Sequence, residues 1–428
     1  MSVPAAGFRH LPVRPDLGQL RRQAKDLLHA IRRREPDALA ELARHHPDAP
    51  NPDDAKLADA QLVLARSYHV PSWPRLVQAC ELTDAIWRDD VDAVRRLVAA
   101  NPRLRDEPAL VRAGSNWGPP MTYAANLGRD RIIDALLDLG ATDLESAVER
   151  ASLQGKVAVA RRLHARMGGP RPNDRALAGP AYTLSGAGTA LLLELGARVH
   201  DDDGRLLAPV DVVLETDSRI PTAKHEILEM YVQHGVALPD TPTMALHRGR
   251  IDLLEAHLRR DPALLRRTFS HEEIYPPEMG CHDEVLATHG TPLAGATLLH
   301  MAIDYDELEI ARWLLDRGMD PNVRAAVDAD GFGGHTPLFS AVVSQPHYRI
   351  NQHGRPDDAP YARLLLDRGA DPNVRASLRK KMHPGYIADD ELREYRDVTP
   401  LSWGERFHFP MLVSRAAMRV VEERGGVR

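Results

Sequence analysis

The sequence predicts an all-α solenoid of about nine helical-hairpin units, preceded by a small helical bundle. Three observations lead to this fold class. Residues 313–325, WLLDRGMDPNVRA, recur almost unchanged as LLLDRGADPNVRA at 364–376. A small residue returns along the chain at intervals close to the length of one helical hairpin. Phe, Trp and Tyr make up only 5% of the residues, which suits a stack of short helices better than one large core.

Residues 1–80 are predicted to form a separate helical module. Helical patterns run through Asp16–Arg34, Pro36–His45 and Lys56–Tyr68, and apolar residues of the first pattern follow the spacing of one buried helix face. The exposed end of a helical stack needs a polar cover, so we expect this module to cap the first unit. Basic residues on the first helix would suit phosphate contacts, but the module's surplus of positive charge is small, so nucleic-acid binding is not favoured.

The rest of the chain, residues 81–428, is divided by a recurring small residue in the first helix of each unit. A small side chain there lets two antiparallel helices approach closely, and a Gly after the second helix supplies a positive φ that ends it. In the stretch Gly295-Ala-Thr-Leu-Leu-His-Met-Ala302, Thr caps the helix and His can bond the turn backbone. The recurring position falls on Ala85, Ala124, Ala151, Leu184, Val213, Ala245, Ala302, Ala341 and Gly404.

These residues resemble the ankyrin repeat, whose units open on a Thr-Pro-Leu-His turn and close on a Gly followed by an Asp-x-Asn turn. The resemblance covers the chain from Thr83 to its end. It implies that His300 and the turns Asp320-Pro-Asn322 and Asp371-Pro-Asn373 are structural. Residues 58–74 are similar to a helical module that precedes ankyrin repeats in bacterial proteins, so we expect a bacterial ankyrin-repeat protein.

The resemblance also implies a function, because ankyrin proteins generally bind partners and do not catalyse. We therefore expect a non-catalytic binding or adaptor protein that recognises a protein or peptide on the concave face, without a cofactor; a small-molecule ligand stays open. Aromatic and Arg side chains are favoured at binding hot spots. Trp403 and Phe407 are also expected to pack with the last insertion. The positions that we expect to contact the partner are Tyr123, His247, Arg248, Met301, Asp304, Tyr305, Trp403, Arg406 and Phe407.

Three insertions break the period, at about 265–293, 344–360 and 377–397. Surplus loops on a solenoid are a usual place for function, although they can also be tolerated surface excursions. The first insertion is rich in His and carboxylates, which gives an alternative hypothesis: a metal-dependent or acid–base hydrolase with its pocket over the inner helices. The candidate catalytic residues are His271, Glu273, His282 and Asp304. The candidate ligands of a divalent metal are His271, His282, Asp283 and His289. A solvated polar loop explains the same residues.

Composition and missing motifs exclude several classes of protein. With 43% hydrophobic residues and a formal net charge of −6, the chain is neither disordered nor a general nucleic-acid clamp. Two cysteines, Cys80 and Cys281, cannot build a disulfide framework. No apolar run reaches the roughly 18 residues of a membrane span. We therefore expect a cytoplasmic protein that does not enter membranes. The chain holds no nucleotide-binding P-loop, no G-x-S-x-G elbow and no C-x-x-C pair.

Overall fold

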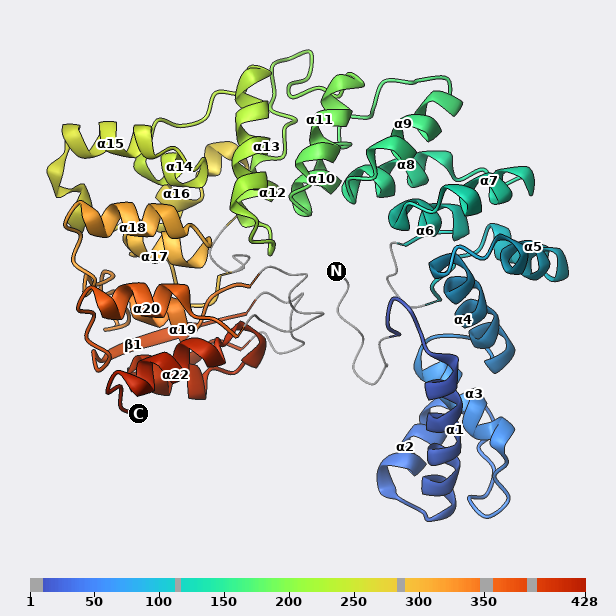
Figure 1. Cartoon of the computed structure of the whole chain (residues 1–428). Helices are drawn as coiled ribbons and strands as arrows, with labels where there is room; N and C mark the ends of the chain where they lie inside the picture. The colour runs from blue at the N-terminus through green and yellow to red at the C-terminus, as the bar shows by residue number, and fades with distance from the viewer. Residues whose placement is uncertain (1–10, 112–116, 283–288, 347–356, 383–390) are drawn as a thin grey trace. The chain divides into compact units, whose positions relative to one another are not determined.

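The computed structural model describes residues 11–111, 117–282, 289–346, 357–382 and 391–428. Its contacts divide the chain into two compact units, an N-terminal unit, Met1–Arg171, and a C-terminal unit, Pro172–Arg428. Both are built from pairs of short helices (Figure 1). The division lies elsewhere than the boundary predicted at residue 80, and that boundary stays a prediction. No helix in the described ranges is long and apolar enough to cross a membrane.

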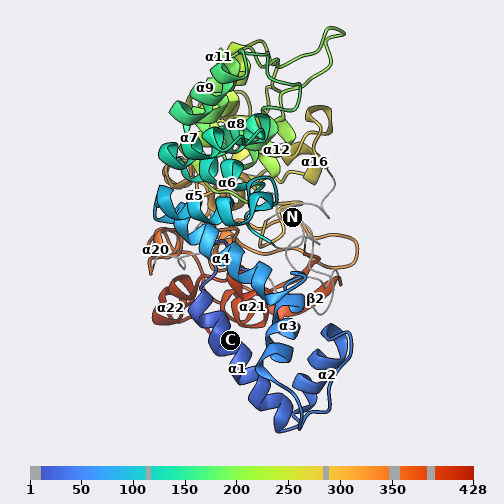
Figure 2. The same cartoon turned by 90° about the vertical axis from the view of Figure 1, so that its right-hand side faces the viewer.

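The N-terminal unit begins with the three helices that the sequence predicts. Helix α1 packs against α2 and α3, and α3 against α4 (Figure 2). Asp16 caps α1 by accepting a bond from the Gln19 N–H at 2.8 Å. The elements of this unit are α1 (Leu17–Arg32), α2 (Pro36–His45), α3 (Leu57–Ser67), α4 (Trp73–Trp87), α5 (Val91–Ala100), the 3-10 turn η1 (Pro102–Arg105), α6 (Pro120–Leu127), α7 (Asp130–Asp138), α8 (Leu144–Leu153) and α9 (Val157–Arg166).

The C-terminal unit is also helical, with one short β-hairpin. The first group of its elements is α10 (Ala178–Tyr182), α11 (Gly186–Glu194), α12 (Val210–Glu215), α13 (Pro221–Gln233), α14 (Pro242–His247), α15 (Ile251–Arg260), η2 (Pro262–Arg266), α16 (His271–Ile274) and η3 (Pro277–Met279). The second group is α17 (Leu298–Asp304), α18 (Leu308–Asp316), α19 (Pro337–Val342), α20 (Pro360–Asp367), β1 (Ala376–Lys380), β2 (Arg393–Val398), α21 (Pro400–Arg406), η6 (Pro410–Leu412) and α22 (Arg415–Glu423).

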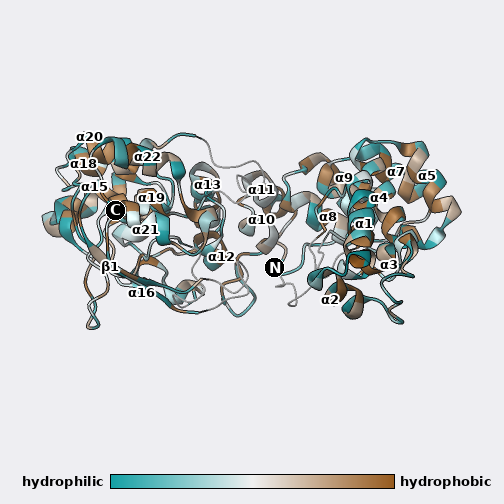
Figure 3. Cartoon of the chain, turned by 90° about the horizontal axis from the view of Figure 1, so that it is seen from below, coloured by the Kyte–Doolittle hydropathy of each residue, from teal (hydrophilic) through white to brown (hydrophobic). Residues whose placement is uncertain are grey.

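Nine packed helix pairs follow the N-terminal module among the described residues: α4–α5, α6–α7, α8–α9, α10–α11, α12–α13, α14–α15, α17–α18, α19–α20 and α21–α22. The predicted all-α fold class is therefore confirmed. In the C-terminal unit the first helices α14, α17, α19 and α21 pack on one another, as do the second helices α18, α20 and α22 (Figure 1). The helices carry both hydrophobic and hydrophilic residues (Figure 3), as expected for elements with one buried side.

Where the recurring position holds a small residue, that residue has the expected steric role, whereas Leu184 and Val213 replace it in two units. Ala245, Ala302 and Ala341 are buried where first helices meet. Gly404 takes this position in α21, where an added Cβ would lie 2.6 Å from Cγ1 of Val342 and 3.0 Å from Sδ of Met418. Glycine therefore suits the last unit, because a methyl group there would require the Val342 side chain of α19 to shift and would crowd Met418 of α22.

The turns that resemble the ankyrin consensus are structural, as predicted. His300 Nδ1 lies 2.9 Å from Thr297 Oγ1, and its Nε2 lies 3.2 Å from the His335 carbonyl oxygen of the next turn. Asn322 Nδ2 donates to Gly369 O at 3.0 Å, and Asn322 Oδ1 accepts from Asp371 N at 2.7 Å. Each turn therefore bonds to the corresponding turn of the following unit.

Extended segments beside the first helices form a ladder that the sequence does not predict. Isolated bridges join Phe269 to Ala296, Val327 to Gly333 and Gly333 to Ser377. Strand β1 then pairs antiparallel with β2. The third predicted insertion, 377–397, is thus in part a β-hairpin that continues a row of backbone pairing. Residues of these paired segments line the candidate site.

Candidate functional site

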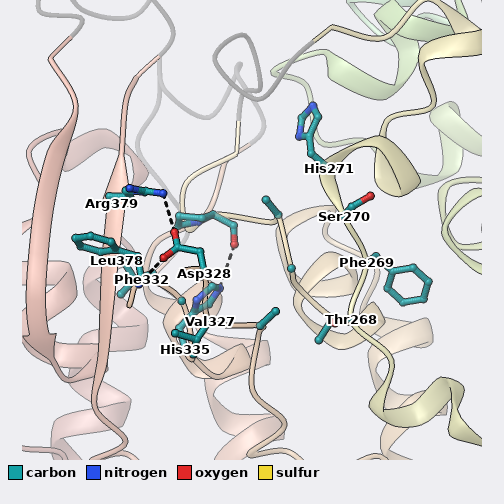
Figure 4. Close-up of a pocket in the computed structure, with 15 residues that line it drawn as sticks. Thr268, Phe269, Ser270, His271, Val327, Asp328, Phe332, His335, Leu378 and Arg379 are labelled. Carbon is teal, nitrogen blue, oxygen red and sulfur yellow. Dashed lines mark hydrogen bonds and ion pairs between the residues drawn. The ribbon is translucent and has the colours of Figure 1, made fainter. Parts of the chain in front are cut away.

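A pocket of about 540 Å³ opens on the ladder of the C-terminal unit. Residues 268–271 of the first insertion form one wall, and β1 contributes Leu378 and Arg379 to the opposite wall (Figure 4). The segment 326–333 lies between these walls and contributes Val327, Asp328 and Phe332. The volume is within the range of roughly 300–1,000 Å³ typical of ligand sites.

The wall at β1 is held by charge pairing around an aromatic ring. Arg379 contacts Asp328 at 2.7 Å and Asp330 at 2.9 Å, and its guanidinium carbon lies 5.0 Å from the centroid of the Phe332 ring. The pKa of Asp328 is lowered, first because its carboxylate accepts the Phe332 N–H and then because of further turn N–H bonds and Arg379. Asp328 is therefore charged and fixed in place at neutral pH.

His335 lines the pocket at the start of α19 and is 1% exposed. Its Nε2 lies 3.0 Å from the Pro292 carbonyl oxygen, and its ring meets that of His300 edge to face at 5.2 Å. Burial lowers the pKa of His335 to about 4. His335 is therefore neutral at physiological pH, and its Nε2–H donates a hydrogen bond to the Pro292 carbonyl oxygen.

The wall from the first insertion is shaped by a capping box. Ser270 Oγ accepts the Glu273 N–H at 3.2 Å, and a Glu273 oxygen accepts the Ser270 N–H at 2.8 Å. Arg267 contacts the other oxygen of Glu273 at 2.6 Å. His271 Nε2 lies 2.9 Å from the His282 carbonyl oxygen. These bonds occupy the polar groups of Ser270 and Glu273 and the Nε2 of His271, whereas Nδ1 of His271 is buried and has no hydrogen-bond partner among the described residues.

Val327 supplies an apolar surface beside the pocket. It is 62% exposed, the most exposed of the large hydrophobic side chains that the structure describes as exposed. The polar rim of Asp328 and Arg379 flanks it. An exposed apolar side chain beside fixed charges is typical of a recognition surface.

The exposure predicted for the partner-contacting positions is wrong for most of them. Seven of the nine are buried, at 5% exposure or less: Tyr123, His247, Met301, Asp304, Tyr305, Trp403 and Phe407. Arg248 is half-buried and paired with Glu229 at 2.6 Å, and Arg406 is exposed beside the Tyr395 ring. Whether these positions contact a partner stays a prediction, but the buried ones offer no surface in this structure.

Local packing explains the burial. In the N-terminal unit the segment before α1 covers Tyr123, whose hydroxyl donates to Val13 O at 2.8 Å and accepts from Trp87 Nε1 at 2.6 Å. Trp403 packs edge to face on Tyr395 of β2 with ring centroids 4.9 Å apart. The last insertion therefore covers the aromatic side chains of α21, as expected for Trp403 and Phe407.

Tyr305 and Asp304 belong to a buried polar network. Arg219 contacts Asp304 at 3.0 Å, and Lys224 contacts Glu307 at 3.0 Å. The Arg219 and Lys224 cations lie 4.6 and 4.4 Å from the centroid of the Tyr305 ring. These four charged side chains are 4% exposed or less. The network therefore fixes the α12–α13 connection to α17, and Asp304 is a packing residue here.

The His and carboxylate candidates of the first insertion have different partners. Glu273 is held by the capping box and Asp304 by Arg219. His289 is fully buried, with Nδ1 at 3.2 Å from Lys380 Nζ, and burial followed by that cation lowers its pKa. A metal ion beside the Lys380 ammonium would be repelled. Asp283 lies outside the described residues.

His282 has a different set of neighbours from the one predicted. Its Nδ1 lies 2.7 Å from a carboxylate oxygen of Glu215 in α12. Among the described residues, the His, Cys, Asp and Glu side chains gathered closely enough for one metal ion are Asp211, Glu215 and His282. No sequence pattern indicated this set, because Glu215 and His282 are 67 residues apart and α12 lies in a weakly matching unit.

Of the candidate residues predicted from the sequence, His271 lines the pocket. The pocket residues on segment 326–333 and β1 were missed, although a signal for the former is visible. Asp330-Gly-Phe-Gly-Gly334 places an aromatic residue among glycines in a connection that needs no bulky side chain. Gly333 has a φ of 117°, and an added Cβ would lie 2.0 Å from Ala326 O. Glycine here therefore permits the close backbone pairing beneath Phe332.

Comparison with known proteins agrees with the turn motifs. A model of the ankyrin repeat family matches residues 294–323, which span α17 and α18. Similar solved structures include the human ASB11 ankyrin repeat domain, with 17% identity, 72% of this chain and 99% of that chain covered, and a TM-score of 0.26. The ankyrin repeat domain of Bcl-3, a member of the IkappaB protein family, has 17% identity, with 66% and 99% covered and a TM-score of 0.21. No curated protein matches. The predicted ankyrin repeat is confirmed.

Proposed function

We propose that this chain, a stack of helix pairs whose residues 294–323 are an ankyrin repeat, is a non-catalytic binding protein that holds a protein or peptide segment in the pocket between residues 268–271 and β1. The observation that carries the proposal is the pocket itself. It lies on backbone ladder segments and is bounded by the exposed Val327 and the fixed Asp328–Arg379 pair. The proposed binding surface therefore lies on the turns beside the inner helices, and not on the inner helices as the sequence analysis expected.

The chemistry of the lining favours binding over catalysis. Ser270 and Glu273 bond to each other's backbone, His271 bonds to the His282 carbonyl, and His335 is buried, neutral and bonded to Pro292. A general base needs a free nitrogen or oxygen within reach of a substrate proton. Nδ1 of His271 and Nδ1 of His335 have no hydrogen-bond partner among the described residues, but both atoms are buried and therefore out of reach of a substrate in this structure. The alternative hypothesis of a hydrolase receives no support from them.

The proposed partner is an extended segment with an apolar residue next to a polar or charged one. An apolar side chain would cover Val327, which is 62% exposed, and remove its surface from water. Asp328 and Arg379 would orient neighbouring polar groups without new side-chain ordering, since they are already fixed. The expected cytoplasmic location and bacterial origin stay predictions.

A peptide-display selection on the purified full chain tests this proposal. We expect enriched peptides to share an apolar residue beside a polar one, and to bind in fluorescence polarisation with a saturable Kd. Val327→Glu is expected to weaken binding at least tenfold, because it places a charge on the apolar contact; one such contact is worth on the order of 1–2 kcal/mol.

Met411→Glu is the matched control, since Met411 is another exposed large hydrophobic residue, at 44%, and does not line the pocket. It should leave peptide affinity unchanged. Selected peptides that bind both variants as tightly as the unmodified chain would show that the pocket is not the binding site.

A further inference from the structure

A separate cluster of Asp, Glu and His side chains in the C-terminal unit joins α12 to the first insertion. Asp211 and Glu215 lie four residues apart in α12, so their side chains project from the same helix face. The chain after η3 brings His282 to this face. One ligand atom from each of the three residues lies within 4.8 Å of the other two.

Contacts hold the imidazole in place beside the carboxylates. Glu215 Oε1 accepts the His282 backbone N–H at 2.6 Å, and Glu215 Oε2 lies 2.7 Å from His282 Nδ1. The Glu215 side chain is only 11% exposed. At Gly280, with φ 88°, an added Cβ would lie 3.6 Å from Asp211 Cβ, so the insertion backbone passes directly over Asp211. Two segments, α12 and residues 280–282, therefore approach each other closely to form the cluster.

Tyr231 of α13 provides an independent sign of a missing ligand. Its side chain is fully buried, and its hydroxyl has no hydrogen-bond partner among the described residues. The Asp211 charge acts on this hydroxyl and, after burial, raises the pKa of Tyr231. A buried hydroxyl normally has a partner, often a bound water. The Tyr231 hydroxyl is therefore a buried donor, under the influence of the Asp211 charge, that lacks a polar partner which a bound water would supply.

The local charge favours a cation. Two carboxylates with one neutral imidazole carry a charge of −2, which one divalent ion balances. A nitrogen ligand disfavours Ca²⁺ and Mg²⁺, which take oxygen ligands, and suits Zn²⁺, which is commonly held by three protein ligands and one water.

We propose that Asp211, Glu215 and His282 bind a divalent transition-metal ion of the zinc class, with a fourth position open to water next to Tyr231. This site shares only His282 with the metal ligands expected from the sequence. Its ion would clamp the first insertion onto α12. Because the His282 carbonyl bonds to His271, the clamp also reaches one wall of the pocket, although the metal site does not depend on the function proposed for it.

Calorimetric titration of the chelator-treated full chain with ZnCl₂ tests the site. We expect saturable binding of one ion per chain. Asp211→Asn, Glu215→Gln and His282→Gln should each weaken zinc affinity at least about tenfold, since each removes a ligand. Tyr231→Phe should weaken it less, because that residue acts only through the bound water. His234→Gln is the control, since His234 is an exposed histidine bonded to its own helix at Met230 O.

Cobalt provides a second readout that does not depend on variants. Co²⁺ in the unmodified chain should give the intense visible bands of a four-coordinate site, and zinc should displace it. Absence of saturable binding, or only the weak bands of a six-coordinate aqueous ion, would overturn the proposal. It would also fail if the three ligand variants, shown by circular dichroism to be folded, bound zinc as tightly as His234→Gln, because the ion would then be adventitious. Neither result bears on peptide binding by the pocket.

Discussion

Replacing Arg219 by Leu should strongly destabilise the C-terminal unit. Arg219 contacts Asp304 at 3.0 Å, and it also donates to the Asp304 and Thr216 carbonyls at 2.8 and 2.7 Å. The two side chains are 2% and 0% exposed. Without the guanidinium, the Asp304 carboxylate stays buried with only the weak N–H contacts of Gln345 and Gly290. Removing one partner of such a pair costs about 3–5 kcal/mol.

The double variant Arg219→Leu with Asp304→Leu tests the cause. Replacing both partners by apolar groups removes the uncompensated charge, so the double variant should be more stable than Arg219→Leu alone, by about 1–3 kcal/mol. Urea unfolding gives the free energies, and hydrogen exchange of α17 and the α12–α13 connection locates the change. Because the chain has two units, the exchange data decide which transition belongs to this site.

An exposed ion pair supplies the control. Arg424 contacts Asp367 at 2.7 Å, but these side chains are 47% and 59% exposed. Arg424→Ala should therefore cost less than about 1 kcal/mol. If Arg219→Leu cost no more than Arg424→Ala, or if the double variant were less stable than the single one, the electrostatic reasoning would be refuted.

Three further predictions concern acid stability and the stacked units. Unfolded His335 binds a proton near pH 6.5, and folded His335 binds one only near pH 4. The contribution of His335 to the free energy of unfolding should therefore be constant above pH 6.5 and fall by on the order of 3 kcal/mol towards pH 4. Urea midpoints that do not fall over this range would contradict it. Gly404→Ala should destabilise by about 1–3 kcal/mol through its clash with Val342, measured as a lower melting temperature. Asn322→Ala removes two bonds between turns and should cost about 1–2 kcal/mol, with faster hydrogen exchange in the Asp371 turn as the readout.

Local pattern was sufficient to predict the repeated architecture. The recurring position lies in the first helix of eight units, whereas Leu184 of the remaining unit lies two residues after the end of α10. The three N-terminal helices were also predicted to within two residues at each end, because capping and apolar spacing act over single turns. The Trp403 contact with the last insertion was predictable for the same reason, since the two segments are close in sequence.

Contacts between distant segments decided which of the predicted contact positions on the first helices are exposed and which are buried. Repeat geometry alone would expose Tyr305 and Asp304, but Arg219 from 85 residues earlier pairs with Asp304 and covers this position. The ladder that carries the pocket depends likewise on pairing between segments of different units, such as Gly333 with Ser377.

The sequence by itself therefore determined the helix pairs, their order and the structural turns, because these depend on residues within one unit. Only the folded chain decided which polar residues are neutralised in the interior and which meet at a surface. Asp211 and His282, and Val327 and Leu378, come together through the stacking of units. No spacing within one repeat encodes such contacts, because the repeat period sets each helix pair and leaves the insertions between them free to pack.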